Sequence, residues 1–150
     1  MGLLVYLREA DMTQSIVLHQ RIHSVSHFQV FLMDREASEG YPDYGHGSSL
    51  ATFSPHAVAV STAWDDNGTV EPNVEIIVSG YDAPSERSDG LKPVADGQIS
   101  VARGGIQVGN VVTNDLNTVA IPEGRYVVTV FTDTLAPFTA RCVRFHLMRL

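Results

Sequence analysis

The chain has 150 residues, of which 44% are hydrophobic and 18% charged, and its formal net charge is −7. This length and composition are typical of one globular domain and exclude a disordered chain. Cys142 is the only cysteine, which excludes an intramolecular disulfide, favours a reducing cytoplasmic setting and predicts a small packed side chain rather than a nucleophile.

The first eleven residues are predicted to be a loosely attached extension, and residues 12–150 to form the folded domain. The apolar run from Leu3 to Leu7 is short, has no basic residues before it and is followed at once by Arg8 and Glu9. It therefore fits neither a signal peptide nor a membrane span.

Apolar residues at every second position predict β-strands along the rest of the chain. In the first half, the expected strands cover 16–23, 25–33 and 56–64. Residues 34–55 lose this periodicity and contain several Gly and Pro, so they are predicted to be a long loop, a kind of segment that is usually functional or mobile. Asp65-Asp66-Asn67-Gly68 predicts a hairpin turn, because Asn and Gly tolerate positive φ.

The second half continues in the same manner. A return strand over 74–78 and a polar loop over 80–93 are followed by strands at 99–101, within 106–132 and at 141–150. Turns are expected at 113–115 and at 121–124. In the last strand, Val143, Phe145 and Leu147 are expected to point inward and Arg144, His146 and Met148 outward. About eight or nine strands without an amphipathic helix predict a single-domain, all-β fold, an antiparallel β-sandwich.

The charge is unevenly distributed. Residues 34–96 contain twelve acidic and three basic residues, whereas residues 97–150 contain three acidic and five basic ones. An acidic band disfavours binding to nucleic acid or to an anionic membrane, both of which need a cationic surface. It permits a basic protein partner, although the acids could equally serve only to keep the domain soluble.

No pattern of catalytic residues stands out. The chain has no phosphate-binding glycine loop, no nucleophile elbow and no Cys/His nucleophile pair. A carboxylate pair for glycoside hydrolysis is the remaining enzymatic alternative, but Asp65 and Asp66 diverge in a turn. The sequence therefore predicts a protein that is not an enzyme and needs no cofactor.

Metal binding is not expected either. Asp65-Asp66-Asn67-Gly68 superficially resembles a calcium loop, but the following residues do not continue the spacing of oxygen ligands. His19, His23 and His27 recur every four residues. On a strand, neighbours at this spacing lie about 13 Å apart, which is too far for a shared metal ion.

Two loops, 34–47 and 80–90, mix acidic residues with tyrosines, which suits a protein interface: tyrosines bury area at low entropic cost, and acids steer a basic partner. The hairpin turn adds Asp65 and Asp66. The candidate partner-binding residues are Asp34, Glu36, Glu39, Tyr41, Asp43, Tyr44, Asp65, Asp66, Tyr81, Asp82, Glu86 and Asp89. The alternative is that these segments are simply solvated.

Three segments resemble the bacterial competence protein J family: SHFQVFLMD, HAVAVSTAW and GIQV…LNTVAIPEGRYVVTVFT. The resemblance covers roughly residues 22–150, and the loop at 34–55 departs from it, matching at most in Glu39-Gly40-Tyr41. Members of this family are small cytosolic inhibitors of a DNA-entry nuclease. The resemblance implies an acidic immunity or inhibitor protein that covers the cationic cleft of a basic nuclease or toxin, with Tyr41, Tyr44 and Tyr81 at the centre of the interface.

Another class of function remains open, a β-sandwich that binds a carbohydrate or assembles with copies of itself. A solvent-exposed Trp64 beside Asp65 would favour a sugar platform, and a buried Trp64 would remove it. The sequence leaves the oligomeric state open.

Overall fold

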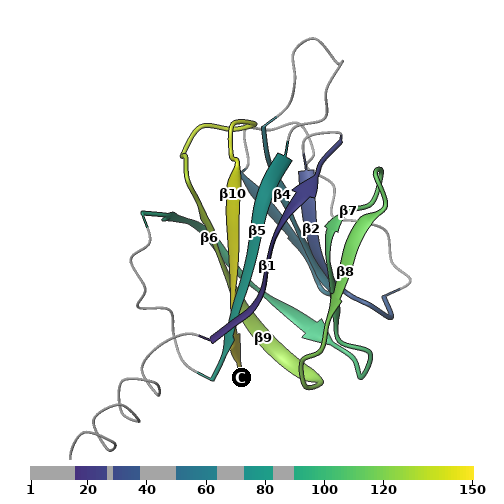
Figure 1. Cartoon of the computed structure of the whole chain (residues 1–150). Coiled ribbons are helices and arrows are strands. Elements are labelled where there is room, and N and C mark those ends of the chain that lie inside the picture. Colours follow the sequence, from purple (N-terminus) through teal and green to yellow (C-terminus); the bar gives the residue numbers. More distant parts are fainter. Residues whose placement is uncertain (1–15, 27–28, 38–49, 64–72, 83–89) are drawn as a thin grey trace, which may run out of the picture.

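The computed structural model describes residues 16–26, 29–37, 50–63, 73–82 and 90–150 (Figure 1). These residues form ten strands and no helix. The strands are β1 (Ile16–Ser24), β2 (Gln29–Asp34), β3 (Ala51–Ser54), β4 (Ala57–Ser61), β5 (Asn73–Tyr81), β6 (Lys92–Val101), β7 (Ile106–Asn110), β8 (Asp115–Val119), β9 (Gly124–Thr132) and β10 (Cys142–Arg149). Accordingly, the described part of the chain contains no helix that could cross a membrane.

The strands form two five-stranded sheets, which confirms the expected sandwich. The order is β1-β5-β10-β9-β6 in the first sheet and β3-β4-β2-β7-β8 in the second. One pair departs from the expected antiparallel pattern: β10 lies parallel to β5, with Phe145 opposite Val78, and antiparallel to β9. The last strand of the chain is therefore inserted in the middle of the first sheet.

Strict alternation of side chains builds the core between the two sheets. Val74, Ile76 and Val78 on β5 are fully buried, and so are Val143, Phe145 and Leu147 on β10. The predicted outward direction of the alternate side chains on β10 is confirmed, but these side chains are not all exposed to solvent. Arg144 and His146 point away from this core, yet they are only 1% and 2% exposed.

Local partners account for part of this burial on the outer face of the first sheet. The Arg144 guanidinium lies over the ring of Phe131, 4.3 Å from its centroid. The Nδ1 atom of His146 lies 3.0 Å from the hydroxyl of Ser79 on the neighbouring strand. The outer face of β10 is thus occupied by paired polar side chains.

Some strand limits differ from those expected. β3 lies inside the predicted loop 34–55, and β6 begins at Lys92, well before the expected strand at 99–101. Both are edge strands, where the sheet imposes less alternation. Pro93 is tolerated in β6 because it lies on an edge, next to an irregularity in the register between Pro93 and Ala95.

One open side of the sandwich is closed by apolar packing between β3 and β6. A Cβ atom at Gly97 would lie 2.6 Å from Cδ1 of Phe53, so the Phe53 ring fits only because Gly97 has no side chain. Beside this contact, the backbone N–H of Ser100 donates to the carbonyl of Pro55 at 2.8 Å. The opposite open side, between β1 and β8, is closed by polar side chains.

Candidate functional site

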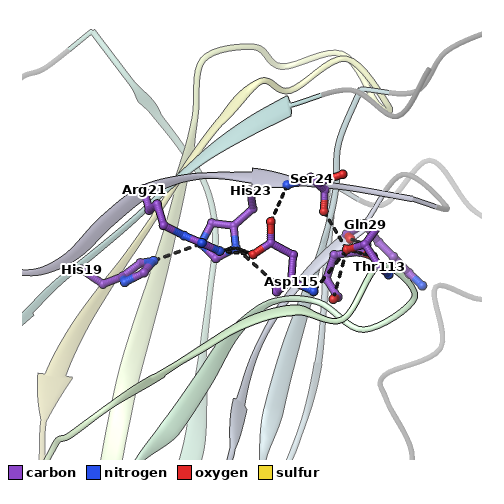
Figure 2. Close-up of polar contacts among 8 residues, drawn as sticks. His19, Arg21, His23, Ser24, Gln29, Thr113 and Asp115 are labelled. Carbon is purple, nitrogen blue, oxygen red and sulfur yellow. Dashed lines mark hydrogen bonds and ion pairs between the residues drawn. The ribbon is translucent and has the colours of Figure 1, made fainter.

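The polar side chains between β1 and β8 are the most concentrated group of interacting charged and imidazole side chains in the described structure (Figure 2). His19, Arg21 and His23 are paired in register with Val78, Ile76 and Val74, whose side chains point into the core. The three polar side chains therefore share the inward face of edge strand β1. Arg21 and His23 contact Asp115 of β8, and His19 contacts His23. Together these four residues are called the edge cluster below.

Asp115 joins the two sheets. Its Oδ2 accepts a hydrogen bond from the backbone N–H of Ser24 at 2.7 Å. Its Oδ1 forms an ion pair with the guanidinium of Arg21. The backbone carbonyl of Asp115 lies 3.1 Å from Nδ1 of His23, and its Oδ1 lies 3.3 Å from the same nitrogen.

The turn between β7 and β8 holds the end of β1 next to this carboxylate. The Thr113 hydroxyl donates to the carbonyl of Ser24 at 2.8 Å. The Nδ2 atom of buried Asn110 donates to the carbonyls of Ser26 and Gln29, both at 2.7 Å. The predicted turn at 113–115 is thus confirmed, and its polar residues have a structural role.

Gly109 makes room for this arrangement. It has a φ of +135°, a conformation that L side chains rarely adopt. A Cβ atom there would collide with the carbonyl oxygen of Asp115 and would lie 3.1 Å from Nδ1 of His23. The close approach of β8 and His23 to β7 therefore requires glycine.

The two histidines of the cluster lie in contact. Nε2 of His19 is 3.0 Å from Nε2 of His23, and the ring centroids are 5.3 Å apart. The spacing argument from the sequence, which separated them by about 13 Å, was wrong for these side chains. It describes the backbone, whereas the rings lean along the strand toward each other. His27 lies outside the described residues.

Both imidazoles are held in the neutral form. Burial, followed by the charges of Arg21 and then His19, lowers the pKa of His23 to about 4. Burial, followed by the charge of Arg21, also lowers the pKa of His19. At neutral pH, each ring therefore keeps one nitrogen with a lone pair.

Four of the twelve predicted partner-binding residues lie in the described structure. Asp34 is only 4% exposed, and its Oδ1 accepts hydrogen bonds from the backbone N–H groups of Glu36 and Ala102, both at 3.3 Å. Glu36 and Asp82 are exposed, and Tyr81 is half-buried. Outside the described residues lie the other eight candidates, Glu39, Tyr41, Asp43, Tyr44, Asp65, Asp66, Glu86 and Asp89, together with Trp64.

Strand register brings Glu36, Tyr81 and Asp82 to one end of the sandwich, called the Asp82 end below. Tyr81 is opposite Met148, and its ring meets the ring of Tyr126 edge-on at 6.5 Å. Tyr126 belongs to the strand that begins at Gly124, opposite Val101, just before the turn from β6 to β7. Glu36 lies against Gly104 in that same turn.

The turn that begins β9 confirms another expectation from the sequence. The Tyr126 hydroxyl donates to the carbonyl of Pro122 at 2.5 Å, which fixes the predicted turn at 121–124. This turn also lies at the Asp82 end, next to Arg149, whose guanidinium donates to the carbonyl of Glu123 at 2.7 Å.

The described part of the Asp82 end carries both signs of charge. Arg35, Arg103 and Arg125 are exposed there beside Glu36 and Asp82. By contrast, the chain leaves the described structure at Ala63 and returns at Asn73 at the opposite end, where Asn73 is paired with Ser24. The structure thus brings Glu36 and Asp82 to the same end of the sandwich. The residues before and after Asp65 and Asp66, in contrast, lie at the opposite end.

Sequence reasoning missed the edge cluster as a unit. The signal that was available is the polar alternation His19, Arg21, His23 on one face of a predicted strand, where a core face should be apolar. The sequence places Asp115, the carboxylate that Arg21 and His23 contact, only in the turn at 113–115. Within the described residues, no group of three or more His, Cys, Asp or Glu side chains is arranged to hold a metal ion.

The fold is similar to that of two solved structures. One is the crystal structure of ComJ from Bacillus subtilis, described as an inhibitor of the DNA degrading activity of NucA, with a TM-score of 0.68, 12% identity, and coverage of 92% of this chain and 100% of that chain. The other is described as crocagin biosynthetic gene J, with a TM-score of 0.57, 11% identity, and coverage of 91% and 99%. No protein-family model and no curated protein sequence matches the chain. The resemblance noted in the sequence is therefore confirmed at the level of the fold.

Proposed function

We propose that this protein is a non-enzymatic inhibitor that binds a nuclease and blocks its DNA-binding cleft. The observation that carries this proposal is the extent of the likeness to ComJ, which spans 92% of this chain and all of the inhibitor. The structural match therefore extends over the whole length of the inhibitor's fold. The mechanism would be occlusion, because a folded domain seated in a cleft excludes the DNA without any chemical step.

The charge of the chain supports a basic partner. The net charge is −7, and twelve acidic residues fall between positions 34 and 96. A nuclease cleft is lined by cations that hold phosphates, so opposite charges would accelerate association, toward about 10⁸–10⁹ M⁻¹s⁻¹ at low salt.

The Asp82 end is the proposed contact region. Asp82 is exposed, and Tyr81 beside it is half-buried and packed against Tyr126, so its ring is already fixed before a partner arrives. A preorganised aromatic side chain loses little entropy on binding. Two of the segments that carry the other predicted tyrosines and acids, 38–49 and 83–89, begin at this end, after Ala37 and Asp82, and rejoin the described structure toward the opposite end, at Leu50 and Gly90. Asp34, in contrast, serves the fold, because its carboxylate is occupied by backbone N–H groups.

The test begins with the tagged full chain as bait in a lysate of its own host, at low and at high salt. The expected result is a basic protein that elutes as salt rises, and whose DNA-degrading activity falls in proportion to added free protein. If the captured protein degrades DNA equally well at saturating concentrations of the bait, the inhibitor function is refuted. If the bait retains only itself, the self-assembling sandwich replaces the proposal.

A charge-matched pair of variants tests the contact region. Asp82→Lys should slow association with the captured nuclease and weaken its dependence on salt, because it replaces a negative charge at the interface with a positive one. Asp96→Lys makes the same change at an exposed position on β6, outside the Asp82 end, and should bind like the unaltered protein. Equal association rates for both variants would move the interface elsewhere on the molecule.

A further inference from the structure

The contact between the two imidazoles of the edge cluster depends on their protonation state. Nε2 of His19 lies 3.0 Å from Nε2 of His23, so one ring donates a hydrogen bond and the other accepts it (Figure 2). A neutral imidazole offers one N–H and one lone pair, whereas a protonated imidazole offers two N–H groups and no lone pair. When both rings are protonated, two N–H donors face each other and the hydrogen bond is lost.

The charges around the pair also oppose double protonation. Nη2 of Arg21 lies 3.0 Å from Nδ1 of His23, and Asp115 is the only carboxylate in contact with either ring among the described residues. The other described elements packed against the rings carry no charge toward them, since β5 offers apolar side chains and β7 offers Gly109. Two protonated rings and Arg21 would therefore place three positive charges against one negative charge.

These surroundings favour the neutral rings only while the site is closed. Burial, followed by Arg21 and then His19, lowers the pKa of His23 to about 4, and burial followed by Arg21 lowers the pKa of His19. A ring that reaches solvent regains its ordinary pKa of 6.5, so an open site binds protons more readily than the closed site. The advantage of the closed site is complete above about pH 6.5 and falls as the pH drops toward 4.

β1 is the element that depends most on this contact. It is an edge strand of the first sheet and pairs, within the described structure, only with β5. Its inward positions carry polar side chains, and His23 is the only buried residue between Ile16 and Ser24. Ile16 and Ile22 are 62% and 61% exposed. A strand that buries so little apolar surface opens at a low cost in free energy.

The C-terminal end of β1 is held independently of the histidine pair. The backbone N–H and carbonyl of Ser24 are bound by the Asp115 carboxylate and the Thr113 hydroxyl. β5 keeps its pairing with β10 when β1 leaves, because the N–H of Glu75 donates to the carbonyl of Arg141 on that side at 2.9 Å. An opening of the rest of β1 about Ser24 therefore leaves the other four strands of the first sheet in place.

We propose that His19 and His23 form a pH-sensitive switch, which holds β1 against β8 while the pair is neutral and releases residues 16–23 when both rings are protonated. Ser24 is the hinge of this movement. Release uncovers the edge of β5 and the apolar side chains at its inward positions. The switch is a property of the fold, so it does not depend on the proposed function and its test needs no partner.

Amide hydrogen exchange on the full chain distinguishes the two sides of β5. Backbone N–H groups alternate in direction along a strand, and the N–H of Glu75 points to β10. The N–H of Ile76 therefore points to β1 and that of Ile77 to β10. Exchange at Ile76 should be faster than at Ile77 and insensitive to low concentrations of urea, which is the behaviour of a local opening. After correction for intrinsic rates, the protection of Ile76 should fall about 30-fold between pH 7.5 and 5, from the change in the pKa of His23 alone.

Two variants assign this fall to the histidine pair. His23→Gln should remove most of it, because glutamine keeps a hydrogen-bonding side chain that does not titrate. This variant leaves Asp115 and every other acid unchanged, so the pH dependence that remains measures their share. His56→Gln is the matched control: Nδ1 of His56 lies 3.1 Å from the carbonyl of Ser100 on the opposite side of the sandwich, and this variant should keep the full fall.

A second measurement needs no variant. Imidazole nitrogen-15 shifts of the unaltered chain should show that His23 is neutral at pH 5 and titrates near pH 4. Equal protection and equal urea dependence at Ile76 and Ile77 would overturn the proposal, since β1 would then open only with the whole domain. The same holds for a constant protection of Ile76 between pH 7.5 and 5, for a fall of equal size in His23→Gln, and for a His23 that titrates at its ordinary pKa.

Discussion

Replacing Asp115 with alanine should destabilise the protein by about 2–4 kcal/mol. The larger part is the hydrogen bond from the Ser24 N–H to Oδ2, at 2.7 Å, because a bond to a charged acceptor contributes about 1.5–3 kcal/mol. The ion pair with Arg21 adds less than about 1 kcal/mol, since the side chain of Arg21 is 46% exposed. Asp115→Asn keeps an acceptor oxygen and should lose about half as much.

The measurement is urea unfolding at pH 7.5 in EDTA, for the unaltered chain, Asp115→Ala, Asp115→Asn, Arg21→Ala and the double variant. The midpoint should fall with little change in slope, because the same surface is exposed on unfolding. In a thermal melt, the same loss corresponds to about 4–15 °C. The coupling between Arg21 and Asp115 should stay below about 1 kcal/mol.

A loss below about 0.5 kcal/mol for Asp115→Ala, the size of an ordinary surface substitution, would refute this reasoning. It would mean that the contact between β1 and β8 is not what closes this side of the sandwich. A coupling energy of several kcal/mol would also contradict it, because the exposed Arg21 would then act as a buried charge.

Two further predictions concern the same side of the sandwich. Gly109→Ala should lower the free energy of unfolding in urea by more than about 3 kcal/mol, because its Cβ would overlap the Asp115 carbonyl. Gly90→Ala should lower it by only about 1–2 kcal/mol, because Gly90 has a φ of +83° but no atom within 4 Å of the added Cβ. Equal losses would show that backbone strain alone, and not the overlap with Asp115, sets the cost. The folded-state pKa of His23, about 4, lies below its ordinary 6.5, so the unfolded chain binds more protons and stability falls as the pH drops from about 6.5 to 4. In EDTA, the unaltered chain should lose about 3 kcal/mol more over this range than His23→Gln, and parallel pH profiles would contradict the burial of a neutral His23.

The sequence predicted the strands that lie between two other strands of a sheet, where apolar and polar side chains alternate regularly. β5, β9 and β10 were found because Val74, Tyr126 and Phe145 belong to unbroken every-second-residue series. β3 and the first half of β6 were missed because edge strands carry small or irregular residues, such as Gly97, whose role is to leave room for Phe53. A single sequence shows no reason for such a glycine until its partner is known.

The two candidate sites differ in how many of their residues and contacts could be predicted from the sequence. Acidic and tyrosine-rich loops are visible as composition, but composition did not reveal that Asp34 is buried and bonded to backbone. The edge cluster depends on a pairing between His23 and Asp115, which are 92 residues apart in sequence. Local patterns place each of these residues on a strand face or in a turn, and only the packing of two sheets brings them together.

The position of β10 determines when the domain can be completed during synthesis. Because Cys142–Arg149 lies between β5 and β9, the first sheet stays divided until these residues have emerged, with two unpaired strand edges exposed. The antiparallel hairpin strands of the second sheet, β3, β4, β7 and β8, all precede β10 and do not depend on it. Late capture of a central strand is a slow, non-local step, so a nascent chain stalled before residue 142 should be the species most prone to aggregation.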